Sequence, residues 1–256
     1  MDTLKQNQQA FSAQSKGFSS AGDTYADGEG LAWMLQDLPV FKDAAVLDIA
    51  TGTGEFARAL APHVATVIGL DATDAMLARG RKFIARAGIT NVTFREGIVQ
   101  DLPFEDDRFD IVSSRYAFHH FADPKPVISE MARVCKPGGH VIVVDIIVPD
   151  EQTAAEYNYY EWLCDRSHTR CLGFREFQSY FRLFEADVIS ARTRDRHEDT
   201  TEWMDFSLTE KQDREEILRA MKAEIAGGSK TGLAAHERGS VLCFEQRDLA
   251  IIARKR

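Results

Sequence analysis

The sequence lacks the features of several large protein classes. No apolar run is long enough to span a bilayer, and the polar, Gln- and Ser-rich segment 1–20 has no hydrophobic signal-peptide core. The four cysteines show no dense framework spacing, which predicts reduced thiols. Basic residues are outnumbered 31 to 40, and the net charge of −9 argues against a nucleic-acid partner. We expect a cytoplasmic protein that binds neither nucleic acid nor membrane.

The composition is typical of a globular chain. Hydrophobic residues make up 44% of the 256 positions and charged residues 28%, enough to bury a sizeable core. The length allows one large domain with an insertion, and no internal repeat divides it. We therefore expect a single domain over residues 1–256.

The most informative stretch runs from Ala44 to Ala57 (AAVLDIATGTGEFA). Its first half is typical of a strand buried on both faces, and its second half begins a helix that Pro62 stops. Gly52 and Gly54 lie between them, where glycine permits a tight turn and lets a ligand approach bare backbone. Asp48 lies at the carboxyl end of the strand, where open α/β sheets bind ligands. The pattern predicts a cradle for a nucleotide-type cofactor.

Two kinds of cofactor fit this cradle. Gly52, Gly54 and Ala57 satisfy the dinucleotide fingerprint, with Asp71 at the end of the next strand as the ribose-binding acid, so NAD is one candidate. Asp48, however, lies where a pyrophosphate would bring negative charge. A carboxylate at this place suits a cationic ligand better.

Strands and helices alternate along the chain, which predicts an α/β fold with a doubly wound, mostly parallel seven-stranded sheet. Besides the strand before the glycines, the expected strands cover residues 65–71, 91–95, 109–114, 140–148, 184–193 and 240–253. The expected helices cover residues 31–38, 73–86 and 126–134. The first nine residues are expected to lack a fixed structure.

Two segments of different texture are expected to form helical cap insertions over the pocket. The first, about 149–173, is aromatic and polar, and the second, about 198–238, begins with a charged helical stretch over 198–226. The apolar members of that stretch are candidates for a homodimer contact: Trp203, Met204, Phe206 and Leu208.

Cys164, His168 and Cys171 follow one another at spacings of four and three. On a helix they would share one face and could bind a soft metal. A structural zinc site wants a fourth ligand, however, and Gly173 and the aromatic neighbours favour plain packing. We therefore expect no metal.

A series of motifs becomes specific in combination. Val46–Gly54 is followed by Gly69–Asp71, Asp101–Phe104 with Phe109–Asp110, His119–Phe121 and Arg133–Gly139. In this order and spacing the series resembles class I S-adenosylmethionine-dependent methyltransferases, most closely the small-molecule type of ubiquinone and menaquinone biosynthesis. The resemblance covers residues 46 to about 145.

This resemblance implies a Rossmann-like fold with S-adenosyl-L-methionine as cofactor. Gly52 and Gly54 would lie under its methionine part, with Asp48 near the ammonium group. Asp71 would accept hydrogen bonds from both ribose hydroxyls. The other residues implied in cofactor binding are Tyr25 as part of a lid, Ala50, Ala72, Met76, Gly97, Ile98, Val99 and Arg115. Ile98 stands where many members of the family carry an acid, so adenine recognition would rest on backbone there.

The implied reaction is an in-line displacement in which a small-molecule acceptor takes the sulfonium methyl group. Orientation and exclusion of water supply most of the rate, and a base is needed only where the acceptor must lose a proton. The candidates for that base are His119, His120, His168 and Asp145. Among them His168 is favoured, because it lies in the cap segment beside aromatic residues.

Two alternatives remain open. An NAD-dependent oxidoreductase is disfavoured because the chain has no Tyr-x-x-x-Lys pair or comparable hydride site. A cofactor-binding protein without methyl-transfer activity would keep the same glycine turn and differ only in lacking turnover.

Overall fold

The computed structural model describes residues 3–14 and 28–256, and its first half alternates strand and helix. The parallel strands are β1 (Ala45–Ile49), β2 (Thr66–Asp71), β3 (Val92–Glu96), β4 (Phe109–Arg115) and β5 (Cys135–Ile147). Between them lie α3 (Glu55–Leu60), η3 (Ala61–His63), α4 (Asp74–Ala87), η4 (Phe118–His120) and α5 (Lys125–Val134). The boundaries have local causes, because Pro62 follows the end of α3 and Gly88, with a φ of 65°, caps α4.

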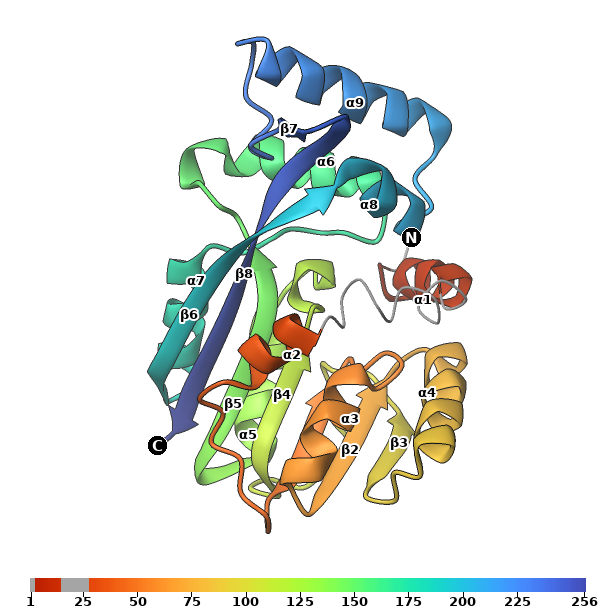
Figure 1. The fold of residues 1–256 in the computed structure, drawn as a ribbon. Coiled ribbons are helices and arrows are strands. Elements are labelled where there is room, and N and C mark those ends of the chain that lie inside the picture. The colour runs from red at the N-terminus through yellow and green to blue at the C-terminus, as the bar shows by residue number, and fades with distance from the viewer. Residues whose placement is uncertain (1–2, 15–27) are drawn as a thin grey trace.

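The strands form one sheet in the order β3-β2-β1-β4-β5-β8-β6 (Figure 1). The pairs from β3 to β5 are parallel, whereas β8 (Val241–Lys255) runs antiparallel to β5 and to β6 (Ala186–Asp199). This confirms the doubly wound, mostly parallel seven-stranded sheet. An eighth strand, β7 (His236–Arg238), pairs with one end of β8. The strand order reverses between β1 and β4, and such a switch point is where these sheets bind ligands.

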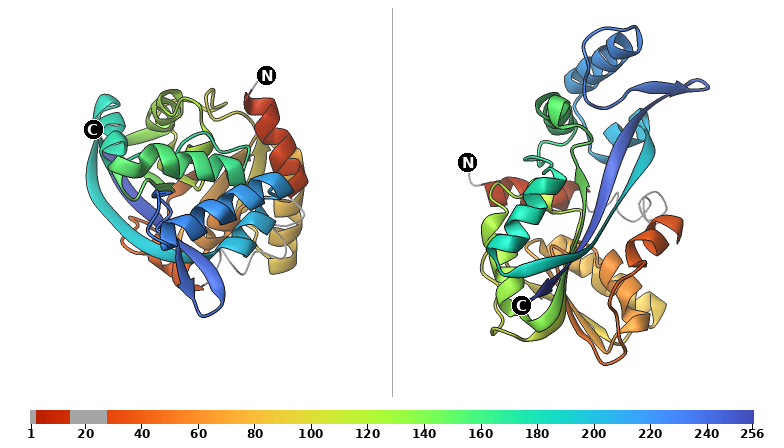
Figure 2. Two further views of the ribbon diagram at one scale, coloured as in Figure 1. Left: turned by 90° about the horizontal axis from the view of Figure 1, so that it is seen from above. Right: turned by 90° about the vertical axis from the view of Figure 1, so that its left-hand side faces the viewer.

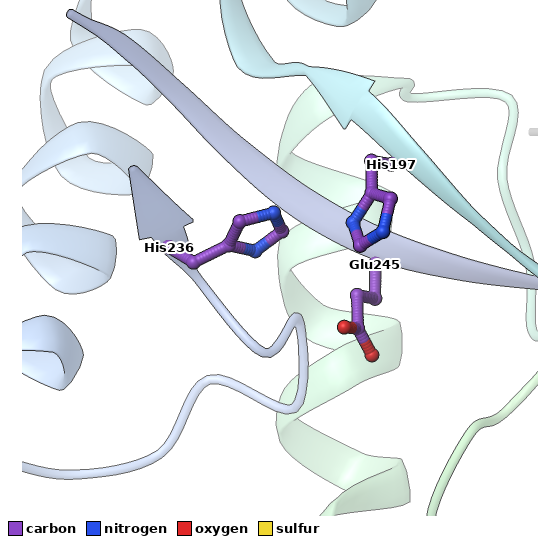
Figure 3. A group of neighbouring side chains, drawn as sticks. All are labelled: His197, His236 and Glu245. Carbon is purple, nitrogen blue, oxygen red and sulfur yellow. The ribbon is translucent and has the colours of Figure 1, made fainter. Parts of the chain in front are cut away.

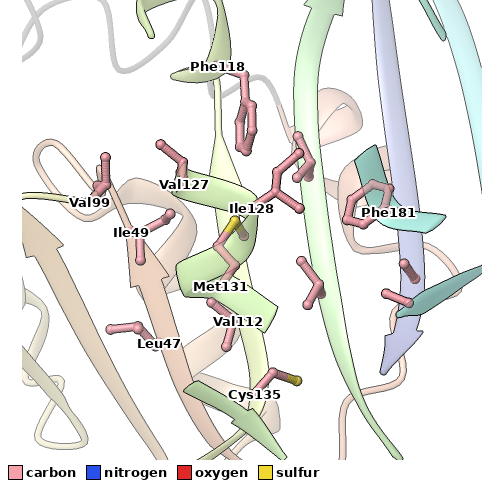
Figure 4. Close-up of a cluster of buried hydrophobic side chains, with 14 of the residues drawn as sticks. Leu47, Ile49, Val99, Val112, Phe118, Val127, Ile128, Met131, Cys135 and Phe181 are labelled. Atoms are coloured by element: carbon pink, nitrogen blue, oxygen red, sulfur yellow. The ribbon is translucent and has the colours of Figure 1, made fainter. Parts of the chain in front are cut away.

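Helices cover both faces of the sheet (Figure 2). On one face α5 and α7 (Phe174–Leu183) pack their apolar sides against the strands, and Met131 and Phe181 are fully buried there (Figure 4). On the other face α2 (Gly28–Leu35) and α3 bury Met34 and Phe56. The central strands β1 and β5 are therefore largely buried on both sides, so polar groups that can meet a ligand are expected at their ends.

A cap lies beyond the carboxyl ends of the parallel strands (Figure 1). It consists of η5 (Glu151–Thr153), α6 (Ala154–Cys164), α8 (Thr200–Phe206), α9 (Lys211–Ile225) and β7. The cap has an apolar cluster of its own, which contains Tyr157, Trp203, Met204 and Phe244. Because Trp203 and Met204 are buried in this cluster, neither is available for the dimer contact expected from the sequence.

Two local expectations differ from the structure. The helix expected over 198–226 is divided, because Asp199 still belongs to β6 and its carboxylate accepts hydrogen bonds from the backbone of Thr201 and Glu202 to start α8. Leu208, with a φ of 57°, leaves the helical conformation and separates α8 from α9. Near the amino terminus, α1 (Thr3–Gln14) is a helix where no fixed structure was expected. Within the described ranges, every helix is too short or too polar to cross a membrane.

Candidate active site

Asp48 joins β1 to β4 at the switch point. Its Oδ1 accepts a hydrogen bond from Ser113 Oγ at 2.7 Å, and its Oδ2 accepts one from Thr51 Oγ1 at 2.5 Å. The residue is only 1% exposed, and this burial raises the pKa of its carboxyl to about 6. In this structure the carboxylate holds the glycine turn against β4, and the contact with a ligand ammonium group stays a prediction.

The turn after β1 has three residues in the left-handed region: Ala50, Gly52 and Gly54 have φ values of 49°, 57° and 75°. A Cβ on Gly54 would lie 2.5 Å from Cε1 of Phe94 on β3, so glycine is required there for packing. A Cβ on Gly52 would have no described atom within 4 Å. Gly52 therefore presents bare backbone to open space, as a ligand cradle requires. Ala50 holds this conformation without being glycine, a strain that tends to occur at functional sites.

Asp71 lies at the end of β2 and holds two neighbouring segments in place. Its Oδ2 accepts a hydrogen bond from the N–H of Gly52, and its Oδ1 accepts one from the N–H of Thr73, both at 2.8 Å. Burial raises the pKa of this carboxyl above its ordinary value. Each carboxylate oxygen can accept a second hydrogen bond. The residue therefore has the capacity to bind two ribose hydroxyls while it orders the turn.

The residues expected beside adenine flank Asp71. Ala72 follows β2 directly, and Met76 is buried in the first turn of α4. The N–H of Gly97 donates to the carbonyl of Asp71 at 3.0 Å, which joins the end of β3 to that of β2. Ile98 and Val99 come next, the first exposed and the second buried.

Arg115, at the end of β4, is engaged by the first turn of α3. Its Nη1 lies 2.6 Å from Oε2 of Glu55, and its guanidinium lies 4.8 Å from the ring centre of Tyr116. The arginine is thus placed at the same edge as the glycine turn, where it ties β4 to α3.

A second polar centre lies at the ends of β4 and β5 around His119. Its Nδ1 lies 2.5 Å from Oδ1 of Asp145, whose Oδ2 accepts hydrogen bonds from the N–H groups of Ala117 and Phe118. Burial alone would lower the pKa of His119, but the charge and hydrogen bond of Asp145 outweigh it, and the pKa is raised. The side chain is 12% exposed. This geometry leaves Nε2 as the ring nitrogen that can accept a proton.

The structure brings His120 and His168 to the same place, with ring centres 4.1 Å and 5.6 Å from that of His119. His120 Nδ1 donates to the carbonyl of Ser167, and burial together with His119 lowers the pKa of His120 to about 4. His168 Nε2 donates to Oδ1 of Asn158, and burial together with both neighbouring histidines lowers its pKa to about 2. Both imidazoles are therefore neutral and weakly basic. The geometry favours His119 as the base over His168, which the sequence had favoured.

Cys164, His168 and Cys171 do not meet the condition that a metal site on a helix would need. Helix α6 ends at Cys164, and the other two residues lie in the loop that follows, so the three do not share a helix face. Cys164 Sγ lies 3.2 Å from Oγ1 of Thr209, which is ordinary packing in the cap. The lid residue Tyr25 lies outside the described residues.

Helix α1 was missed by the sequence analysis and contacts both halves of the site. Gln8 Nε2 donates to the carbonyl of Ala72 at 2.7 Å, and Asn7 Nδ2 donates to the carbonyl of His120 at 3.1 Å. The ring of Phe11 packs edge-on against His120, with ring centres 4.9 Å apart. The polar, Gln-rich composition of this helix carried no signal for such a role.

Two polar residues of α6 were also missed. Asn158 Oδ1 accepts hydrogen bonds from His168 and from the N–H of Cys171, so it fixes the tautomer of that histidine. Glu161 is buried and accepts a hydrogen bond from Gln246 on β8 at 3.1 Å, and burial raises the pKa of its carboxyl. Neither residue belongs to a sequence motif. Their roles depend on hydrogen-bond partners elsewhere in the chain, which the local sequence does not indicate.

The fold and these two centres define a class of protein, a doubly wound α/β protein with a glycine turn between two carboxylates at its switch point. Residues 47–143 match the family described as methyltransferase domain. The uncharacterised methyltransferase YcgJ of Bacillus subtilis is 39% identical over 158 residues, which cover 61% of this chain and 62% of YcgJ. The demethylmenaquinone methyltransferase of Shouchella clausii is 35% identical over 118 residues, covering 45% of this chain and 50% of that protein.

The chain thus spans about half to three fifths of the length of these curated relatives. The likeness in three dimensions extends further. The crystal structure of YcgJ superimposes with a TM-score of 0.80 at 28% identity, covering 90% of this chain and 99% of that one. A phosphoethanolamine N-methyltransferase of Haemonchus contortus, solved with phosphomonomethylethanolamine and S-adenosylhomocysteine, shares the fold with a TM-score of 0.59 at 20% identity. That match covers 89% of this chain and 52% of the nematode protein.

Proposed function

We propose that the chain is a cytoplasmic S-adenosylmethionine-dependent methyltransferase that acts on a small-molecule acceptor. The observation that carries this proposal is the open backbone at Gly52, which lies after β1 between the buried Asp48 and the half-buried Asp71. A cofactor with a ribose and a cationic sulfur suits these carboxylates better than one with a pyrophosphate.

Cofactor binding is assigned to the glycine turn and the ends of β2 and β3. Asp71 holds the ribose, Gly52 leaves room for the amino-acid part, and Met76 with the backbone near Ile98 and Val99 faces the adenine. When bound, S-adenosyl-L-methionine supplies a methyl group that is already activated on sulfur.

Acceptor activation is assigned to His119. Asp145 fixes the ring through Nδ1 and raises its proton affinity, so Nε2 is the atom that takes a proton from an acceptor O–H or N–H. His120 and His168 pack against this ring as neutral groups. The cap segments 149–173 and 198–238 are proposed to close over the acceptor, because α6 supplies Asn158 and Glu161 to the same buried cluster. A partly apolar or aromatic acceptor fits the apolar surroundings of these groups.

Calorimetry tests the cofactor. We expect S-adenosylhomocysteine to bind the full chain and NAD to bind weakly or not at all. Asp71→Ala should weaken S-adenosylhomocysteine binding by on the order of 1–3 kcal/mol, the scale of hydrogen bonds to a charged group. An unfolding curve of the same variant separates this loss from disorder of the turn. Unchanged affinity would contradict the ribose assignment, and tight NAD binding would favour the oxidoreductase.

Turnover of a panel of small metabolites, followed as release of S-adenosylhomocysteine, tests the activity itself. His119→Gln should lower turnover by roughly 10²–10⁴-fold with cofactor affinity intact, the usual contribution of a general base. His168→Gln should lower it much less. With the raised pKa of His119, kcat/KM should rise with pH and level off above the ordinary imidazole value, and Asp145→Asn should shift that rise to lower pH. Equal losses in the two histidine variants would contradict the assignment. Cofactor binding without any turnover would leave a binding protein as the better description.

A further inference from the structure

Three side chains converge at the cap end of the sheet, on the side of the molecule where β7 pairs with β8 (Figure 3). They are His197 on β6, His236 at the start of β7 and Glu245 on β8. Their nitrogen and oxygen ligand atoms all lie within 4.8 Å of one another. The proposed methyl transfer uses none of the three.

The strand register explains this convergence. His197 is paired directly with Glu245 across the antiparallel β6–β8 ladder, so their side chains lie on the same face. His236 is paired with Cys243, two residues from Glu245 along β8 and therefore also on that face. The two imidazole rings lie with centres 5.0 Å apart and an interplanar angle of 78°.

His236 has the hydrogen bonding of a metal-binding histidine. Its Nδ1 lies 3.0 Å from the carbonyl oxygen of Ala234, so Nδ1 carries the proton and donates it to that bond. Its Nε2 therefore has a free lone pair, and this atom is buried without a hydrogen-bond partner among the described residues. Ligating histidines commonly donate their other ring N–H to a backbone carbonyl in this way. A buried acceptor without a partner needs an explanation, and a bound cation supplies one.

The remaining charges around the three side chains leave Glu245 available. Arg247, the next residue on the same face of β8, is held by both oxygens of Asp195 through its Nε and Nη2. His197 is exposed and Glu245 is half-buried, so an ion can reach the site and the side chains can adjust. A metal about 2.0–2.2 Å from each ligand atom needs the three groups to move closer by roughly 1 Å, which the exposed side chain of His197 allows.

We propose that His197, His236 and Glu245 bind one divalent transition-metal ion of the Zn²⁺ type. Two imidazoles and one carboxylate suit zinc and its neighbours, whereas Mg²⁺ and Ca²⁺ prefer oxygen ligands alone. Three protein ligands leave a fourth position for water. The ion joins β6, β7 and β8 where they carry the cap, and its effect is to stabilise this end of the sheet.

The test uses the full chain after removal of metals with a chelator. Zn²⁺ and, separately, Mg²⁺ are titrated by calorimetry at a fixed pH of about 7.5, because metal binding depends on pH. We expect one Zn²⁺ per chain to saturate and Mg²⁺ not to bind. At a free Zn²⁺ concentration of 100 times Kd, the melting temperature should rise by about 5–10 °C. His197→Ala and Glu245→Gln should each weaken Zn²⁺ binding at least about tenfold and abolish most of that rise.

Two control variants make the outcome specific. His63→Ala removes an exposed histidine in η3, far in sequence from the three proposed ligands. Cys243→Ser removes the thiol of the residue that pairs with His236 across β7 and β8. Both should bind Zn²⁺ as the wild type does. The proposal is overturned by failure of Zn²⁺ to saturate below millimolar concentration, by equal affinity of the wild type and His197→Ala, or by loss of binding in Cys243→Ser. Glu245→Gln preserves the shape of the side chain, so it reports on the carboxylate even if a histidine variant folds poorly.

Discussion

The two glycines of the turn provide a sharp test, because the same substitution has different consequences two residues apart. Both Gly52 and Gly54 have positive φ, so replacing either by alanine costs about 1–2 kcal/mol for the left-handed backbone. At Gly54 the added methyl group also meets the ring of Phe94, which lies against Gly69 and Gly80 as well. Overpacking of this kind costs a further 1–3 kcal/mol or so.

We therefore expect Gly54→Ala to lose roughly 2–5 kcal/mol of stability and Gly52→Ala only about 1–2 kcal/mol. For a chain of this size, each kcal/mol lowers the melting temperature by about 2–4 °C. Urea unfolding at one pH gives the two free energies of unfolding directly. Binding of S-adenosylhomocysteine should rank the variants in the opposite order, because a methyl group on Gly52 enters the open space assigned to the cofactor.

A double variant checks the cause. Gly54→Ala combined with Phe94→Leu shortens the ring side chain that the new methyl group meets, so part of the lost stability should return as a coupling energy of about 0.5–3 kcal/mol. If Gly54→Ala were no less stable than Gly52→Ala, or if the coupling were zero, the contact with Phe94 would not be the reason for glycine at this position.

Two further predictions concern buried carboxylates. Burial raises the pKa of Asp48 from 3.8 to about 6, so the folded state holds a proton that the unfolded state releases, and stability should fall as pH rises from about 4 to about 6. Asp48→Asn should remove this fall, worth about 3 kcal/mol, in urea unfolding at several pH values, and parallel curves for the two proteins would contradict it. Asp248 is 0% exposed and accepts hydrogen bonds from Arg194 and Arg196, so Asp248→Asn should cost about 3–5 kcal/mol in the same assay. The more exposed Asp195→Asn should cost under about 1 kcal/mol, and a similar loss in both would refute the role of burial.

Much of the geometry of the glycine turn, to which we assign cofactor binding, was predictable from contiguous sequence. A buried strand, an acid, two glycines and a helix lie within Ala44–Ala57, and each feature acts on its own neighbours. Asp71 was predictable for the same reason, since it ends the next strand and strands of a parallel sheet end at one edge. The sheet itself followed from alternation of strand and helix, because that pattern leaves few topologies.

The acceptor half depended on contacts that sequence does not display. His119 and His168 were both candidates, but their ranking came from Asp145 beside the first and from burial of the second. Helix α1 gave no signal, because its role rests on polar side chains that reach distant backbone carbonyls.

The chain by itself determined the order of its strands and helices and the place of the glycine turn, because these depend on backbone conformation and short-range patterning. Only the tertiary structure decided which imidazole is basic, which glycine is needed for packing and which residues of β6, β7 and β8 meet. These properties depend on burial and on neighbours far away in sequence, and a proton affinity or a metal-binding geometry exists only once those neighbours have been brought together.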